Sequence, residues 1–380
     1  MSYKVLARKW RPTKFSEVVG QEHVLRSLIS ALDNDRIHHA YLLAGTRGVG
    51  KTTLARILAR CLNCELGVGS EPCGQCSACT EIEEGRFVDL IEVDAASRTK
   101  VEDTRELLDN VQYLPARARF KVYLIDEVHM LSTHSFNALL KTLEEPPAHV
   151  KFIFATTDPQ KLPVTILSRC LQFNLKNLAP TEITKYLAEV LEQEGVESDK
   201  KALWQLATAA NGSMRDALTL ADQGISHCND KFTEENISEM LGVPTSEQVV
   251  VLLRAMATRD VKEVLLVLQK IEDKAVDYIN YLDNLLAAFH QIMLAQVDVE
   301  FINEHGVNAA EFKQLAKLFT AEDVQLYYQL GLKGRNEMSL ASVVRSAFEM
   351  LILRMMLFSP AYSEPSETLI TDPNDQKKKT

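Results

Sequence analysis

The chain has 380 residues, of which 46% are hydrophobic and 25% charged, and this composition suits a soluble globular protein of two or three domains. No apolar run reaches the roughly 18 residues of a membrane span, and the N-terminal segment lacks the apolar core of a signal peptide. We therefore expect no membrane partner, a cytoplasmic location and reduced thiols. The net charge of −10 by itself argues against a nucleic-acid partner.

The charge is unevenly distributed along the chain. Residues 1–60 hold 11 Lys/Arg and 4 Asp/Glu, a net of +7, so the remainder carries −17. A basic face on the N-terminal part and ordinary solvated surface charge are both possible interpretations of this distribution.

Within this N-terminal part, Arg11 and Val19 precede a glycine-rich loop, where they could help to hold a nucleotide base. Residues 21–33 show the apolar spacing of a helix.

A glycine-rich loop follows a short apolar run at residues 40–44, which predicts a buried strand, and precedes a segment with helical apolar spacing. The loop fits G-x-x-x-x-G-K-[ST], the phosphate-binding P-loop. Its glycines let backbone N–H groups turn toward phosphate oxygens, Lys51 can reach the β- and γ-phosphates, and the Thr52 hydroxyl can bind Mg²⁺. A chance glycine turn would lack the flanking strand and helix. The residues predicted to bind the nucleotide here are Gly45, Thr46, Arg47, Gly48, Val49, Gly50, Lys51, Thr52 and Thr53.

Four of the seven cysteines fall within 16 residues, directly after the predicted P-loop helix. They are Cys64, Cys73, Cys76 and Cys79. In a reducing compartment such a cluster favours a metal over a disulfide, and four thiolates suit a closed tetrahedral Zn²⁺ site. No position is left for water, so the zinc would be structural. Cys61, Cys170 and Cys228 are expected to be buried thiols.

Residues 87–93 predict an apolar strand, and Thr99 and Glu102 form a capping box for the helix that follows. The basic residues Arg98, Lys100 and Arg105 crowd this helix start. Together with free backbone N–H groups they could hold DNA phosphates. Ordinary surface charge at a helix cap is an equally good interpretation.

A near-continuous apolar strand at residues 121–125 is followed by Asp126 and Glu127, the Walker B pattern. After a P-loop this pair indicates ATP hydrolysis, with Asp126 holding Mg²⁺ and Glu127 acting as the general base for water. A helix capped by Ser132 and stopped at residues 146–147 comes next.

A further buried strand is predicted at residues 150–155, and Thr157 follows its carboxyl end, where it could touch the γ-phosphate. Arg169 lies in a Ser-Arg-Cys sequence before another short strand at residues 171–173. Strands near residues 41, 88, 122 and 151 alternate with helices. This alternation predicts an α/β core with a parallel, doubly wound sheet flanked by helices.

From residue 180 onward we expect helices only. Four of them, at residues 181–195, 198–211, 213–228 and 233–241, would form a small domain, with Arg215 near the start of the third. A third, all-helical segment runs from about 244 to 358, and its apolar runs at 278–293 and 340–357 would serve as core or subunit interface. Residues 361–380 are polar and are expected to be disordered.

These motifs stand in the order found in AAA+ ATPases, and the Ser-Arg-Cys sequence at 168–170 resembles the clamp-loader branch of that family. The cysteine insertion after the P-loop helix also looks like that of bacterial clamp-loader subunits. The resemblance extends over essentially residues 1–360. It implies an ATPase core at 1–178 with a zinc module at 64–79, a lid at 179–243 and an oligomerisation collar at 244–360. Longer family members continue further, so the chain resembles a short form or a truncation.

The resemblance also implies a mechanism. Lys51 and Glu127 would serve catalysis, Arg169 would act in trans on a neighbour's site, and Thr157 and Arg215 would be sensors. The ATPase would work within a DNA polymerase holoenzyme, in a hetero-oligomeric pentameric ring with delta- and delta-prime-type subunits that loads a sliding clamp on primer–template DNA. ATP, Mg²⁺ and Zn²⁺ are the implied cofactors. Two alternatives remain: an ATP-gated assembly scaffold, against which Glu127 argues, and a DNA motor.

Overall fold

The computed structural model describes residues 5–97, 110–228, 231–272, 277–298 and 309–358. The chain divides into two compact units, residues 1–237 and 238–380. The predicted capping box and basic residues at 98–105 and the polar tail at 361–380 lie outside the described residues. None of the described helices is both long enough and apolar enough to cross a membrane.

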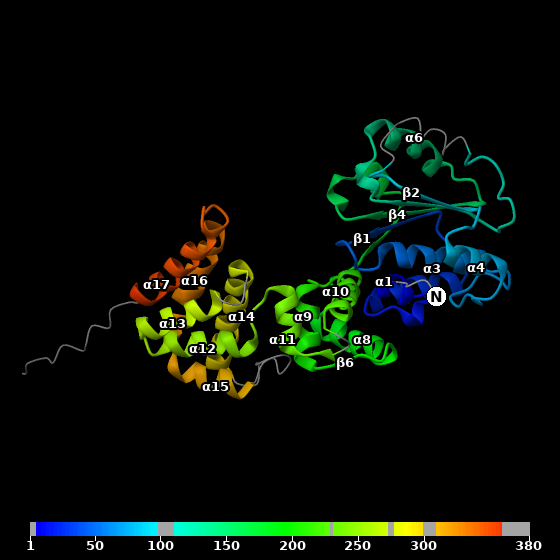
Figure 1. Ribbon diagram of the computed structural model, residues 1–380. Coiled ribbons are helices and arrows are strands. Elements are labelled where there is room, and N and C mark those ends of the chain that lie inside the picture. Colours follow the sequence, from blue (N-terminus) through cyan, green and yellow to red (C-terminus); the bar gives the residue numbers. More distant parts are fainter. Residues whose placement is uncertain (1–4, 98–109, 229–230, 273–276, 299–308, 359–380) are drawn as a thin grey trace, which may run out of the picture. The chain divides into compact units, whose positions relative to one another are not determined.

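A five-stranded parallel sheet, with strand order β2-β3-β4-β1-β5, forms the centre of the first unit (Figure 1). The predicted α/β class with a parallel sheet is confirmed. The strands are β1 (Ala40–Ala44), β2 (Leu90–Asp94), β3 (Lys121–Asp126), β4 (Val150–Thr156) and β5 (Leu171–Asn174). In the register of the sheet, Ala44 pairs with Thr156, and Asp94 pairs with Asp126. The polar residues that end the strands therefore meet at one edge, where open α/β sheets bind ligands.

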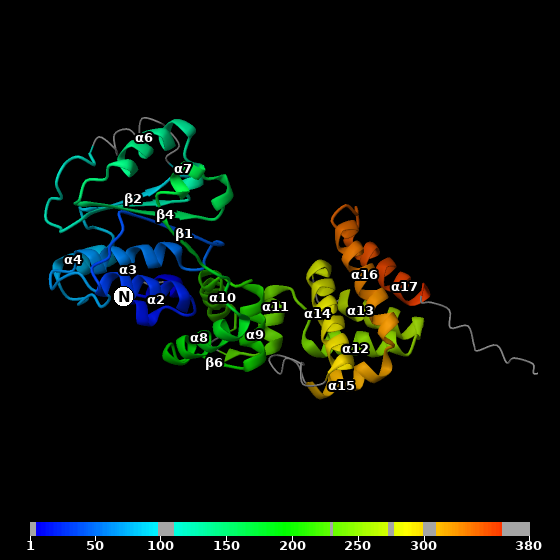
Figure 2. The same ribbon diagram turned by 180° about the vertical axis from the view of Figure 1, so that it is seen from behind.

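Helices cover both faces of this sheet. The side chains of its central strands are therefore buried on both faces, and the sequences of these strands are continuous apolar runs. Tyr41 and Leu43 of β1 belong to the core formed with the helices of one face, whereas Leu42 belongs to the core on the opposite face. Figures 1 and 2 show α3 and α6 on opposite sides of the sheet. The first face carries α2 (Glu22–Asp33), α3 (Lys51–Asn63) and α4 (Ser77–Glu84), and the second carries α6 (Thr133–Glu144) and α7 (Val164–Leu167). Four short turns of helix are also present: α1 (Leu6–Lys9), η1 (Phe15–Glu17), η2 (Val128–Met130) and η3 (Pro159–Lys161).

The strand predicted at residues 87–93 begins only at Leu90, so its predicted start was wrong. Val88 is 67% exposed. The chain turns at Asp89 because its carboxylate accepts hydrogen bonds from the backbone N–H groups of residues 116, 117 and 118, at 2.7, 2.8 and 2.9 Å. The alternation of apolar and polar residues along a strand does not reveal that Asp89 binds the backbone of a loop distant in the sequence.

After the sheet, the chain forms the predicted set of helices with ends shifted by a few residues, and the last of them crosses the boundary between the two units after residue 237. They are α8 (Pro180–Gln193), α9 (Lys200–Ala209), α10 (Met214–His227) and α11 (Glu234–Leu241). The Ser213 side chain caps α10, accepting the N–H of Asp216 at 3.2 Å. The expectation of helices alone was wrong, because β6 (Glu197–Ser198) and β7 (Lys231–Phe232) pair in parallel. Two residues are too few to show a strand period.

The second unit is helical throughout its described part. Its elements are α12 (Ser246–Ala257), α13 (Val261–Glu272), α14 (Tyr278–Val297), α15 (Ala309–Leu318), α16 (Ala321–Met338) and α17 (Val344–Leu357). Their apolar faces share one core around Tyr281, Phe289 and Phe348. A Cβ at Gly334 of α16 would collide with the Leu351 side chain, so this glycine permits close packing of α16 and α17. The apolar run predicted from residue 340 starts too early, since Leu340 is 89% exposed in the turn before α17.

Candidate nucleotide and metal sites

The predicted P-loop connects β1 to α3 at the ligand-binding edge of the sheet. Gly45, Gly48 and Gly50 have φ angles of 155°, 81° and 103°, which side chains with a Cβ rarely adopt. Gly48 is also crowded, because a Cβ there would collide with the Ser213 hydroxyl. Gly50 is the N-cap of α3, so the free N–H groups of that helix start within the loop. This backbone is suited to binding phosphate oxygens.

Lys51 is buried, and its ammonium group lies inside the loop. Its Nζ donates hydrogen bonds to the carbonyl oxygens of Gly45 at 2.7 Å and Thr46 at 2.9 Å. Burial lowers the pKa of Lys51, while the nearby carboxylates of Glu127 and Asp126 act in the opposite direction. The ammonium is thus held where its contacts with two carbonyl oxygens can be exchanged for contacts with phosphate oxygens.

The oxygen ligands expected for Mg²⁺ lie side by side. The Thr52 hydroxyl donates a 2.7 Å hydrogen bond to Asp126 Oδ2, and Asp126 Oδ1 accepts the backbone N–H of Glu127 at 3.0 Å. A hydroxyl and a carboxylate at one edge of the sheet, beside the phosphate loop, match the hard oxygen ligands that Mg²⁺ prefers.

Glu127 follows β3 in the left-handed region, with φ 48° and ψ 45°. A non-glycine residue in this region is uncommon and is often found at functional sites. Glu127 Oε2 accepts hydrogen bonds from the backbone N–H of Thr157 at 3.1 Å and from its hydroxyl at 2.9 Å. The structure therefore brings the predicted base Glu127 and the predicted sensor Thr157 together, and Thr157 donates its hydrogen bonds to the Glu127 carboxylate.

Two predicted arginines also lie at the loop. Arg11 Nε donates to the Thr53 hydroxyl at 3.2 Å. Burial lowers the pKa of Arg11, and the positive charges of Arg56 and Arg215 lower it further. The backbone N–H of Arg215 donates to the Gly48 carbonyl at 3.4 Å. The arginines at positions 11 and 215 thus reach the same site from distant parts of the sequence.

The other predicted nucleotide-binding residues differ in their exposure. Thr46 and Arg47 are exposed at the tip of the loop, Val49 is buried, and Val19 is half-buried in the turn before α2. The Thr46 hydroxyl donates a 2.5 Å hydrogen bond to Asn177 Oδ1. Asn177 was missed from the sequence, because no motif marks it and only the fold brings it to the loop.

Arg169 forms an ion pair within its own chain. Its Nη2 lies 2.7 Å from Glu144 Oε1, and its Nη1 donates to the Thr165 carbonyl at 2.8 Å. The Arg169 side chain is 32% exposed, so it remains accessible at the surface. The predicted action of Arg169 on a neighbouring subunit stays a prediction.

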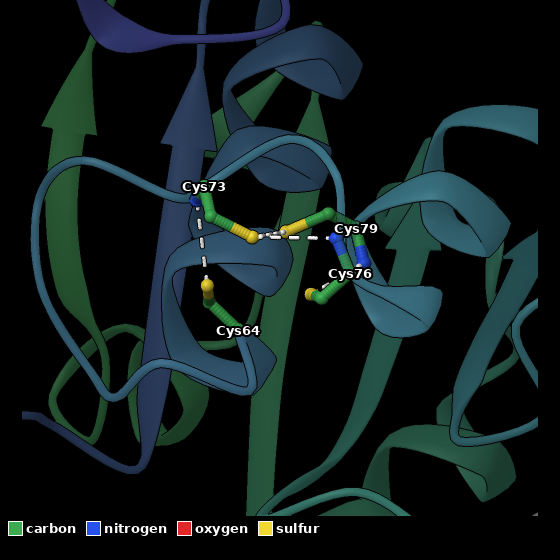
Figure 3. Close-up of side chains that lie close together, drawn as sticks. All are labelled: Cys64, Cys73, Cys76 and Cys79. Atoms are coloured by element: carbon green, nitrogen blue, oxygen red, sulfur yellow. Dashed lines mark hydrogen bonds between the residues drawn. The ribbon is translucent and has the colours of Figure 1, made fainter.

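The four clustered cysteines point toward one another (Figure 3), and their Sγ atoms all lie within 4.8 Å of one another. A tetrahedral zinc with Zn–S bonds of about 2.3 Å requires sulfurs roughly 3.8 Å apart, and the Sγ atoms of Cys73 and Cys79 are 4.0 Å apart. Backbone N–H groups also point at three of the sulfurs, with N···S distances of 3.3–3.4 Å. Such donors stabilise thiolates, so the residues fit the proposed Zn²⁺ site.

The other three cysteines behave largely as predicted. Cys61 and Cys228 are buried, whereas Cys170 is only half-buried. Burial raises the pKa of both Cys61 and Cys170 to about 12. A thiol with so high a pKa is a poor nucleophile and a poor metal ligand at neutral pH.

Comparisons with known families cover nearly the whole chain. A family model described as DNA polymerase III, delta subunit, matches residues 20–179. A model described as DNA polymerase III clamp loader subunit, ATPase lid domain, matches residues 182–230. A model described as DNA polymerase III subunits gamma and tau domain III matches residues 232–368.

Individual relatives agree with these matches. The chain is 53% identical to DNA polymerase III subunit tau of Escherichia coli over 96% of its own length and 57% of that protein. It is 44% identical to DNA polymerase III subunit gamma of Buchnera aphidicola over 93% of its length and 97% of that protein. The chain thus spans a little more than half of the E. coli relative and nearly all of the Buchnera relative. Among solved structures it is similar to the Thermotoga maritima RuvB branch migration motor, with 21% identity over 65% of this chain, 79% of that chain and a TM-score of 0.49.

Proposed function

The chain belongs to the family of bacterial DNA polymerase III gamma and tau subunits, and from this premise we propose that it is an ATP-hydrolysing subunit of a clamp loader. In this proposal it assembles with delta- and delta-prime-type subunits into an open pentameric ring. The ring opens the sliding clamp, grips primer–template DNA and releases the closed clamp on the DNA when ATP is hydrolysed.

The observation that carries the proposal is the set of contacts at the carboxyl edge of the sheet. Lys51 lies inside the glycine loop, Thr52 and Asp126 share a hydrogen bond, and Glu127 stands beside them at the end of β3. A phosphate site, a pair of Mg²⁺ ligands and a carboxylate base are the three parts that ATP hydrolysis needs. A scaffold that only binds ATP would not require the base.

Each residue then has a distinct role. Lys51 and the loop N–H groups bind and orient the β- and γ-phosphates, and Thr52 and Asp126 hold Mg²⁺, which supplies positive charge against the developing negative charge. Glu127 polarises the attacking water, a contribution of typically 10²–10⁴-fold. Thr157 and Arg215 sense the nucleotide, and Arg11 and Val19 border the space for the base.

The proposal extends to residues beyond this site. Arg169 acts on the site of a neighbouring subunit, and Arg98, Lys100 and Arg105 bind DNA phosphates. The zinc module at 64–79 is structural, since its four ligands leave no position for substrate. Residues 1–178 form the ATPase core, 179–243 the lid and 244–360 the collar that holds the ring together.

ATP turnover measured with each component added separately tests this function. The assembled complex should hydrolyse ATP slowly alone, little faster with primed DNA, and much faster with primed DNA plus sliding clamp. Full stimulation by DNA alone would favour a DNA motor. Turnover that responds to neither addition would favour the assembly scaffold.

A further inference from the structure

His129 occupies a half-buried position beside the proposed catalytic base. It lies in the 3-10 turn η2, two residues after Glu127, and its side chain is only 9% exposed. Its Nδ1 is 2.9 Å from the Thr156 hydroxyl oxygen and 3.4 Å from Glu127 Oε2. Neither the P-loop nor the Walker B pattern assigns a role to this residue.

The surroundings of Nδ1 define what the imidazole can do. Thr156 is the last residue of β4, and its Oγ1 also accepts the backbone N–H of Asp158 at 3.1 Å. A hydrogen on Nδ1 can be donated to the Thr156 hydroxyl, and Glu127 Oε2 lies 3.4 Å from the same nitrogen, which is a close charge contact and not a hydrogen bond. The negative charge of the carboxylate beside Nδ1 favours a hydrogen on that nitrogen.

Among the described residues, the hydrogen bonds and the ionic contact of the Glu127 side chain all involve one oxygen. Oε2 receives the N–H and hydroxyl of Thr157 and lies beside His129 Nδ1. Among the described residues, Oε1 makes no hydrogen bond. A carboxylate fixed through one oxygen presents the other in a defined direction, which is what a base needs to polarise a water molecule.

We propose that His129 is a positioning residue for Glu127. It joins the end of β4 to the carboxylate, and together with Thr157 it holds Oε2 so that Oε1 is directed at the attacking water. This inference rests on the proposed ATPase function and adds to it a residue that acts through Glu127 without touching the nucleotide.

The packing of the turn supports a polar role for the imidazole. Val128 is fully buried and fills the core beneath η2, whereas Met130 is 47% exposed. His129 lies between them with its Nδ1 on polar groups of two strand ends. A residue needed only to fill space here would not require a ring nitrogen at this position.

Three substitutions separate hydrogen bonding from packing. His129→Phe keeps an aromatic ring and removes Nδ1. His129→Asn places an amide nitrogen at the same number of bonds from the backbone as Nδ1. His129→Gln moves that amide nitrogen one bond further from the backbone. His134→Ala, at an exposed position of α6, is the matched control. ATP affinity, kcat and KM are measured on the complex assembled with its partner subunits, primed DNA and clamp, and thermal unfolding verifies folding.

We expect His129→Phe and His129→Gln to lower kcat about tenfold with ATP affinity unchanged, because the base is misdirected and not removed. His129→Asn should recover most of the rate, and His134→Ala should match the wild type. In a Glu127→Gln background, His129→Phe should have no further effect, since the group it positions is already gone.

The inference is overturned if folded His129→Phe keeps the wild-type kcat, or if the effects of the Phe and Gln substitutions on kcat multiply with that of Glu127→Gln. His129 would have a purely structural role if His129→Phe, His129→Gln and His129→Asn all lost ATP affinity or all unfolded at a lower temperature than the wild type. Absence of hydrolysis in the wild-type complex would instead overturn the proposed ATPase function.

Discussion

Lys51 shows how one side chain depends on the backbone around it. The loop carbonyls of Gly45 and Thr46 hold its ammonium group, and the positive φ angles of the loop glycines make that arrangement accessible. The sequence motif predicts the residue types, and the fold supplies the burial that strengthens a charge–phosphate contact.

Replacing Lys51 with Ala should abolish tight ATP binding, because a buried positive charge beside the phosphates is lost. We expect the Kd to rise at least about 100-fold, in line with two or more charge-assisted hydrogen bonds. Isothermal titration with a slowly hydrolysed ATP analogue measures this directly. Lys141→Ala, at an exposed position of α6, is the control, and equal affinity in both variants would contradict the P-loop assignment.

Arg169 raises the question of which site it serves. In a single chain it pairs with Glu144, and an exposed ion pair of this kind contributes only about 0–1 kcal/mol. The pair therefore presents little obstacle to a second use of the guanidinium. An arginine that neutralises charge on a γ-phosphate contributes 10³–10⁵-fold in related ATPases and GTPases.

Mixing two inactive variants tests whether Arg169 acts in trans. Arg169→Ala alone should bind ATP normally, and rings made only of Arg169→Ala or only of Lys51→Ala should hydrolyse little ATP. Rings that contain both should regain part of the activity, because an intact Arg169 can serve an intact P-loop in the adjacent chain. Arg169→Lys should rescue poorly because the planar fork is lost. If subunits demonstrably exchange and activity does not return, the in-trans role is wrong.

At the scale of elements, the long periodic segments were predictable and the short or side-chain-dependent ones were not. The strand at β1, the helix at α3 and the cap at Ser132 follow from apolar spacing and capping chemistry alone. The pair β6–β7 is too short to show a period, and the start of β2 depends on Asp89 binding a loop about 27 residues away. His129 was likewise not predicted as a site residue, because its hydrogen-bond partner Thr156 comes from the neighbouring strand β4.

The cysteine module is joined to the P-loop helix by two connections. Cys64 directly follows the last residue of α3, and the buried guanidinium of Arg60 in that helix donates to the Cys79 carbonyl from Nε and Nη2 at 3.1 and 3.0 Å. Arg60 also donates to the Thr13 carbonyl at 2.9 Å. The module thus supports the end of the helix opposite the nucleotide site.

We predict one zinc per chain, and we expect its removal to destabilise this region without removing a catalytic group. Metal analysis should give a stoichiometry near one, and Cys76→Ser should lower it and reduce the thermal midpoint by several degrees. Cys170→Ser, which alters a thiol outside the cluster, should change neither. Stoichiometry near zero in the wild type, or free titration of all seven thiols in the native protein, would contradict the zinc site.

At the scale of the whole molecule, the family match accounts for both units of the chain. The models for the clamp-loader lid and for gamma and tau domain III adjoin near residue 231, a few residues before the first compact unit ends at residue 237. The apolar runs of the helical second unit were predicted to serve as core or subunit interface and not as a catalytic site. Its large shared core suits the proposed role of a collar, in which packing and not chemistry is the function.

The most direct test of the account is ATP-dependent transfer of a labelled sliding clamp onto primed circular DNA, separated from free clamp by gel filtration. The wild-type complex should transfer the clamp only with ATP, and Lys51→Ala should transfer none. Glu127→Gln should bring clamp, DNA and loader together and fail to release them, because binding remains and turnover is lost. Equal transfer with and without ATP, or by the Lys51→Ala complex, would contradict the proposal that this chain is the ATPase of a clamp loader.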